Sequence, residues 1–199
     1  MFAAGVAALL ESGLGLSPWD VLHQGIARHT PLSFGEAIIA VGVVVMLAAW
    51  ALGESPGFGT VANGVLVGVF VDRLTAIGAV DNLRDASLAV RILLLAGGIL
   101  LIGVATALYI GAALGAGPRD SLMLAGVHHT GVRVGVIRAV LEGSALIAGI
   151  ALGGTFGVGT IAYALLVGPV VELSFWAIVR TPLATPRLRL PDDDPWSLA

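Results

Sequence analysis

The sequence predicts an all-α polytopic membrane protein with six transmembrane helices, arranged as two inverted three-helix repeats. The first observation is the composition: 57% of the residues are hydrophobic and 12% are charged, whereas about 25% of the residues of a soluble domain are charged. Several apolar runs also approach the roughly 20 residues that a spanning helix needs. The second observation is that one pattern of residues occurs twice, 100 residues apart.

The repeat is carried by small, polar and turn-forming residues at matching positions. In the first copy these include Leu14, Gly15, Pro18, Asp20, His29, Thr30, Gly57, Gly59 and Thr60, and in the second Leu114, Gly115, Pro118, Asp120, His129, Thr130, Gly157, Gly159 and Thr160. The predicted organisation is a first repeat over residues 1–80, a connecting loop at 81–91, a second repeat over 92–180 and a disordered tail at 181–199. We expect any site to lie where the two copies meet.

The elements follow the same order in both copies. In the second copy we expect spanning helices at 92–114, 134–152 and 160–179, with a short segment at 118–129. In the first copy we expect helices at 33–52 and 60–80, with a short segment at 18–28. The first helix has only about fourteen apolar residues, or about 21 Å against a hydrocarbon core of about 30 Å. Either translation begins further upstream, which we favour, or this helix is short. A signal peptide is disfavoured because no basic segment precedes the apolar run.

The distribution of arginine predicts the orientation in the membrane. Three spans per copy place the second copy in the opposite orientation to the first. With both termini inside, the inner side carries Arg119, Arg133, Arg180, Arg187 and Arg189, and the outer side carries Arg28, Arg84 and Arg91. The excess of inner arginines favours this orientation in a bacterial cytoplasmic membrane.

The short segments 18–28 and 118–128 each begin with Pro-x-Asp. A proline at the first position and an acidic residue at the third are typical of a helix start, so Asp20 and Asp120 are interpreted first as helix caps. Alternatively, each short helix enters the protein and presents its N-terminus or its aspartate to a ligand. The sequence leaves open whether these helices are re-entrant or interfacial.

Other polar residues in apolar surroundings are candidate ligands for a substrate or an ion. His29 and His129 end the short helices, where a structural role is also expected. Asp72 and Glu172 are carboxylates at matched positions within predicted spans, which is costly unless they are paired or solvated. Arg138 and Glu142 are spaced i, i+4 and predict an ion pair on one helix face.

Three strings of residues resemble the YczE-like family of bacterial integral membrane proteins, which is similar in character to the YitT type. They are Gly-Leu-Gly-Leu-Ser-Pro-Trp-Asp-Val-Leu-His-Gln-Gly at 13–25, Ser33-Phe34-Gly35, and Gly57-Phe58-Gly59-Thr60-Val61-Ala62-Asn63. The resemblance covers residues 1 to about 180. It implies a multi-pass protein of the bacterial cytoplasmic membrane and assigns no site residue. Members usually begin with a basic segment and a full first helix, and this sequence departs from them there.

The leading functional hypothesis is a small secondary transporter or permease whose substrate lies between Asp20, Asp120, Asp72 and Glu172. The alternative is an accessory membrane protein that assembles with or stabilises another complex. We expect no enzymatic activity, because no nucleophile or acid–base pair stands out, and no metal or cofactor. The expected partners are membrane lipids and a small molecule or ion, with a homodimer left open. The formal net charge of −3 argues against nucleic acid.

Overall fold

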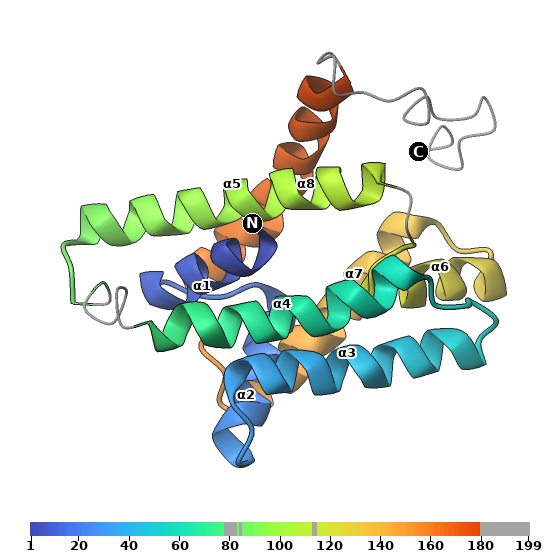
Figure 1. The fold of residues 1–199 in the computed structure, drawn as a ribbon, viewed down its shortest axis with the longest axis horizontal. Helices are drawn as coiled ribbons and strands as arrows, with labels where there is room; N and C mark the ends of the chain where they lie inside the picture. Colours follow the sequence, from blue (N-terminus) through green and yellow to red (C-terminus); the bar gives the residue numbers. More distant parts are fainter. Residues whose placement is uncertain (78–82, 84, 113–114, 180–199) are drawn as a thin grey trace.

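The computed structural model describes residues 1–77, 83, 85–112 and 115–179. Within these ranges the chain forms eight α-helices and no strand (Figure 1). They are α1 (Phe2–Ser12), α2 (Pro18–His29), α3 (Phe34–Ala51), α4 (Phe58–Ala76), α5 (Leu88–Gly111), α6 (Pro118–Thr130), α7 (Val134–Ala151) and α8 (Val158–Val179). The predicted tail at 181–199 and the predicted end of the first repeat at residue 80 lie outside the described residues.

Local sequence accounts for where the helices begin. The Ser17 side chain caps α2 by accepting a hydrogen bond from the backbone N–H of Asp20 at 3.2 Å, with Pro18 as the first helical residue. At the start of α3, Ser33 and Glu36 form a reciprocal capping box. The short helices α2 and α6 and the longer helices after them therefore follow the predicted boundaries closely.

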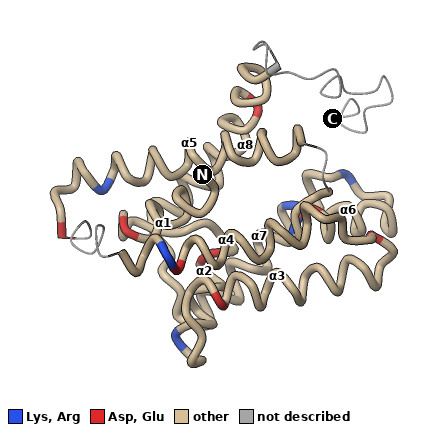
Figure 2. The backbone as a smooth tube through the Cα atoms, in the orientation of Figure 1, with Lys and Arg blue, Asp and Glu red and all other residues tan. Residues whose placement is uncertain are grey.

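Five helices, rather than the six predicted, are long and apolar enough to cross a membrane within the described residues. These are α3, α4, α5, α7 and α8. Helix α1 has 11 residues, or about 16 Å, which is short of the hydrocarbon core. Charged residues are sparse along the five long helices (Figure 2). Large apolar side chains such as Phe58, Leu93 and Ile147 are exposed on their outer faces, as expected for surfaces in contact with lipid.

The core between the copies forms where α1 crosses α5. A Cβ atom at Gly5 would lie 2.8 Å from the carbonyl oxygen of Gly98, and one at Gly98 would lie 2.9 Å from the carbonyl oxygen of Gly5. Small residues let the two backbones approach this closely. Leu9 and Ile102 are fully buried beside this crossing, so the first helix of each copy packs mainly on the first helix of the other.

The loop before each short helix contacts the Gly-x-Gly-Thr turn of the other copy. Gly15 of the first copy has φ +135°, and a Cβ atom there would lie 2.7 Å from the backbone nitrogen of Thr160 in the second copy. Gly115 has φ +117°, and its Cβ would lie 2.9 Å from Oγ1 of Thr60 in the first copy. The Thr60 hydroxyl also donates a hydrogen bond of 2.6 Å to the carbonyl oxygen of Ala116. The Gly-x-Gly-Thr turn of each copy therefore supports the short helix of the other.

The two copies differ in how their last two helices pack. In the first copy α3 packs along α4, whereas the corresponding α7 and α8 make at most marginal contact. Helix α7 packs instead on α2, and α8 packs on α5 (Figure 1). Residues of α7 and α8 line one cavity together with residues of α5 and α6.

Candidate functional site

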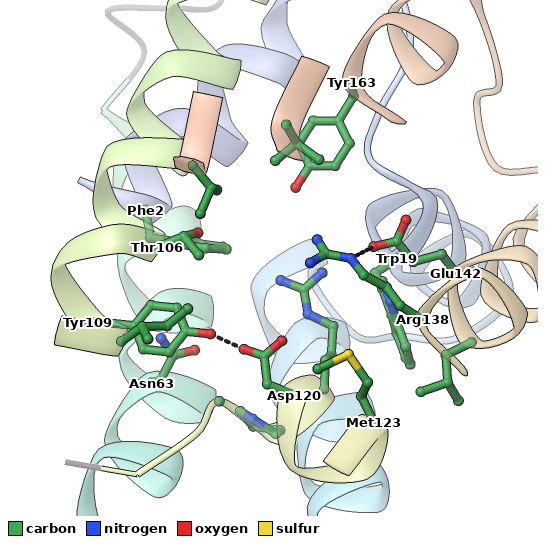
Figure 3. A pocket seen from close by; sticks show the side chains of 17 residues that line it. Phe2, Trp19, Asn63, Thr106, Tyr109, Asp120, Met123, Arg138, Glu142 and Tyr163 are labelled. Atoms are coloured by element: carbon green, nitrogen blue, oxygen red, sulfur yellow. Dashed lines mark hydrogen bonds and ion pairs between the residues drawn. The ribbon is translucent and has the colours of Figure 1, made fainter. Parts of the chain in front are cut away.

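A cavity of about 110 Å³ lies between the copies and is lined mainly by α5, α6, α7 and α8. Phe2, Trp19 and Asn63 of the first copy complete its wall. Figure 3 shows Tyr109 and Asp120 on one side, Arg138 and Glu142 on the other, and Tyr163 above them. The wall therefore brings together four charged side chains, those of Arg119, Asp120, Arg138 and Glu142.

Arg119 is the second residue of α6 and is held by aromatic side chains of the first copy. Its guanidinium carbon lies 5.9 Å from the centre of the Phe2 ring and 5.8 Å from that of the Trp19 ring. Both distances fit a cation–π interaction. The guanidinium makes no hydrogen bond and no close ion pair with the described residues. Its N–H donors are thus positioned by packing and remain available to the cavity.

Asp120 is the third residue of α6, outside the five membrane-length helices. The Tyr109 hydroxyl donates a hydrogen bond to Oδ2 of Asp120, as Figure 3 shows. Burial raises the pKa of this carboxyl to about 6; the charge of Arg138 opposes the rise and that of Glu142 adds to it. The group therefore changes its charge near neutral pH.

Arg138 and Glu142 form the predicted ion pair on α7. Arg138 Nε lies 3.1 Å from Oε1 of Glu142, and the two side chains are 50% and 26% exposed. The pair lines the cavity rather than facing away from it. The two charges compensate each other, and the partly open geometry leaves donors of Arg138 free to reorient toward a ligand.

Asp20, the counterpart of Asp120, has a different environment. The Ser17 hydroxyl donates a 2.5 Å hydrogen bond to its Oδ2, and Nδ1 of His23 lies 3.2 Å from its Oδ1. Burial alone would raise the pKa of Asp20, but the hydrogen bonds from His23 and Ser17 and the charge of Arg119 hold it below its ordinary value. Asp20 and His23 line a smaller cavity of about 40 Å³ that adjoins the first and shares Arg119 with it.

Asp72 and Glu172 are not brought together and do not line either cavity. Oδ1 of Asp72 accepts a 2.7 Å hydrogen bond from the backbone nitrogen of Gly35, and its Oδ2 accepts one from the Ser33 hydroxyl. Asp72 thus ties the end of α4 to the start of α3. Glu172 is exposed on α8. Of the four matched carboxylates, Asp120 lines the cavity of about 110 Å³ and Asp20 lines the one of about 40 Å³, whereas Asp72 and Glu172 line neither.

His29 and His129 lie at the C-terminal ends of α2 and α6. Nδ1 of His29 is 3.0 Å from the carbonyl oxygen of Gly25, and Nδ1 of His129 is 3.3 Å from that of Ala125. Each ring thus contacts the carbonyl four residues earlier, which is a common role for histidine in a last helical turn. Neither lines either of the two cavities described above.

The sequence argument missed several cavity residues, although the repeat contains a signal for them. Where the first copy has Trp19, Leu9 and Asn63, the second has Arg119, Tyr109 and Tyr163. At each of these positions the two copies carry side chains of different chemical type, as they do at Arg138 and Glu142, where the first copy has Ile38 and Gly42. The orientation argument used Arg119 as one of the arginines on the inner side of the membrane, and the structure shows that it also lines the cavity. A residue-by-residue comparison of the copies would have identified this set.

Comparisons with known proteins define the family. Residues 1–175 match the model of a family of unknown function, DUF6198. The chain is 37% identical over 178 residues to an uncharacterized protein of Haemophilus influenzae, covering 89% of this chain and 80% of that protein. It is 35% identical over 181 residues to the uncharacterized membrane protein YczE of Bacillus subtilis, covering 87% of this chain and 80% of that protein.

A more distant relative is the uncharacterized protein YyaS of Bacillus subtilis, 24% identical over 189 residues, with 88% of this chain and 90% of that protein covered. No solved structure matches the chain. The YczE-like resemblance noted in the sequence is therefore confirmed, and the five long apolar helices agree with a multi-pass membrane protein. The chain belongs to the YczE-like family of bacterial membrane proteins and matches the DUF6198 model over most of its length.

Proposed function

We propose that the protein is a small secondary transporter of the bacterial cytoplasmic membrane and that the cavity between the copies is its substrate site. The observation that carries this proposal is the set of ionisable side chains, Arg119, Asp120, Arg138 and Glu142, around one cavity. Ionisable residues within a membrane protein are costly and mark substrate or ion pathways. In this protein the four side chains line one cavity and are not dispersed among the loops.

The repeat supports the same proposal. Transporters built from inverted repeats bind substrate at the repeat interface, beside the ends of short or broken helices. In this chain α2 and α6 are such short helices, and Arg119 and Asp120 occupy the first turn of α6. The exchanged contacts of Gly15 with Thr160 and of Gly115 with Thr60 fit two copies related by a pseudo-twofold axis. Two similar halves around one site could expose it to each side of the membrane in turn.

The proposal is tested by solute movement across a membrane. The purified full chain is reconstituted into liposomes that contain a pH-sensitive dye, and gradients of small charged metabolites are applied. We expect at least one solute to enter wild-type liposomes, with or without a proton, and entry to fall at least tenfold with Glu142→Gln. The matched control is Glu172→Gln, which removes an exposed carboxylate outside the cavity and is expected to leave entry unchanged.

Two outcomes would contradict the transporter. Wild-type liposomes that admit no solute faster than protein-free liposomes would do so, and so would equal effects of the two glutamine variants. The accessory role then becomes the better hypothesis, and it predicts a stable protein partner after extraction in a mild detergent.

A further inference from the structure

The cavity wall contains one guanidinium, that of Arg119, which makes no ion pair within 4 Å among the described residues, although its charge reaches Asp20 and lowers the pKa of that carboxyl. The guanidinium carbon of Arg119 lies 5.9 and 5.8 Å from the centres of the Phe2 and Trp19 rings. A guanidinium presents five N–H donors in a planar fork that matches a carboxylate. The two flanking rings offer no hydrogen-bond acceptor of the ordinary kind to these N–H donors. This arrangement suits a carboxylate on a ligand.

The neighbouring residue supplies one negative charge that is only partly satisfied. Asp120 accepts a hydrogen bond from Tyr109 through Oδ2, and its Oδ1 accepts none from the described residues. In the first copy both oxygens of Asp20 are occupied, by Ser17 and His23. The positions that would supply those partners to Asp120 are Gly117 and Met123, which carry no such donor. The second copy has thus freed one carboxylate oxygen toward the cavity.

The remaining charges of the wall cancel. Arg138 and Glu142 form an ion pair at 3.1 Å and carry no net charge together, so Arg119 and Asp120 are the two charged residues of the wall that have no ion pair within 4 Å among the described residues. A simple anion would meet Arg119 but would be repelled by Asp120. A simple cation would meet Asp120 but would be repelled by Arg119, and the aromatic faces of Phe2 and Trp19 are already occupied by that arginine. A ligand with one charge of each sign satisfies both residues.

We propose that this cavity binds a small zwitterion, a molecule with a carboxylate that pairs with Arg119 and an ammonium group that pairs with Asp120. The volume of about 110 Å³ restricts it to a compact molecule. This inference rests on the proposed function only in taking the cavity as the substrate site. Binding itself does not require that transport occurs.

The test compares matched ligands on the full chain in detergent or nanodiscs at pH 7.5. The probes are glycine, L-alanine and β-alanine as zwitterions, propionate as the carboxylate alone, and ethylammonium as the ammonium alone. Thermal unfolding and calorimetric titration report binding. We expect at least one zwitterion to raise the unfolding temperature and to bind at least tenfold more tightly than propionate and ethylammonium, because each charge-assisted hydrogen bond adds about tenfold or more.

Variants then assign the two charges. Arg119→Gln and Asp120→Asn are each expected to weaken zwitterion binding at least tenfold, and Arg133→Gln, in the exposed connection before α7, is the control. Equal binding of propionate, or no binding by any of the zwitterions, would overturn the inference. The comparison of ligands on the wild type decides the matter even where a variant does not fold. If zwitterions bind but are not transported, the proposed transport function is wrong and the inference about the ligand stands. If simple anions are transported, the inference about the ligand is wrong and the proposed transport function stands.

Discussion

The Tyr109 hydroxyl donates a hydrogen bond to Asp120 in the wall of the cavity, at a pair of positions where the first copy has Leu9 and Asp20. Leu9 is fully buried against α5, and Asp20 is held by Ser17 and His23 within its own helix. One repeat uses this position for packing and capping. The other uses it to orient a carboxylate toward an open space, and the predictions below separate these two uses.

Asp120 is expected to make stability depend on pH. Its pKa is about 6 in the folded protein against an ordinary 3.8. Between about pH 4 and 6 the folded state therefore binds more protons than the unfolded state, and stability falls as the pH rises through this window. Asp120→Asn should remove that fall in thermal unfolding measured from pH 4 to 8, while Asp85→Asn in the exposed loop should retain it. An unchanged pH profile for Asp120→Asn would show that this carboxyl is not buried in the manner described.

The tight contacts of Gly15 predict a large cost for an added methyl group. Gly15→Ala would place Cβ 2.7 Å from the Thr160 nitrogen at φ +135°, so both steric overlap and backbone strain oppose it. We expect a loss of about 2 kcal/mol or more in unfolding free energy. Gly53→Ala is the matched control, because Gly53 also has positive φ, at +92°, but no atom within 4 Å of its Cβ. Denaturation of both variants in detergent should rank Gly15→Ala as clearly the less stable.

Asp72 is expected to be structural rather than functional. Asp72→Ala removes two hydrogen bonds that join α4 to the start of α3 and should cost about 1–3 kcal/mol. Ser33→Ala should cost a similar amount, because it removes the bond to Asp72 and also the bond that the Ser33 hydroxyl accepts from the Glu36 backbone N–H in the capping box. Glu172→Gln, on the exposed face of α8, should change stability by less than about 0.5 kcal/mol. Thermal unfolding checks the order, and a loss of solute entry in folded Asp72→Asn would instead support the carboxylate-centred site that the sequence suggested.

The ion pair of α7 is expected to contribute little to stability. With Arg138 half exposed, its pairing with Glu142 should be worth about 0.3–0.5 kcal/mol. A double-mutant cycle with Arg138→Gln and Glu142→Gln measures this coupling directly. A coupling above about 2 kcal/mol would mean that the pair is a buried structural element, and its role in the cavity would then need another explanation.

Local chemistry made much of the fold predictable. Pro18 and Ser17 define the start of α2, and the predicted segments 118–129 and 134–152 correspond to Pro118–Thr130 and Val134–Ala151. Such signals act over a few residues, so they can be recognised without a partner. The pairing of Arg138 with Glu142 belongs to the same class, because i and i+4 share a helix face.

The sequence by itself determined the helical segments, their apolar character and the duplication that relates them, because hydrophobic runs, caps and repeats are properties of neighbouring residues or of fixed spacing. The tertiary structure decided which polar residues share a cavity. Asp72 finds its partners on α3, whereas Arg119 finds Phe2 and Trp19 in the other copy. A polar side chain in a helix is satisfied or left available according to what packs opposite it, and for these residues that is set by helices distant in the chain.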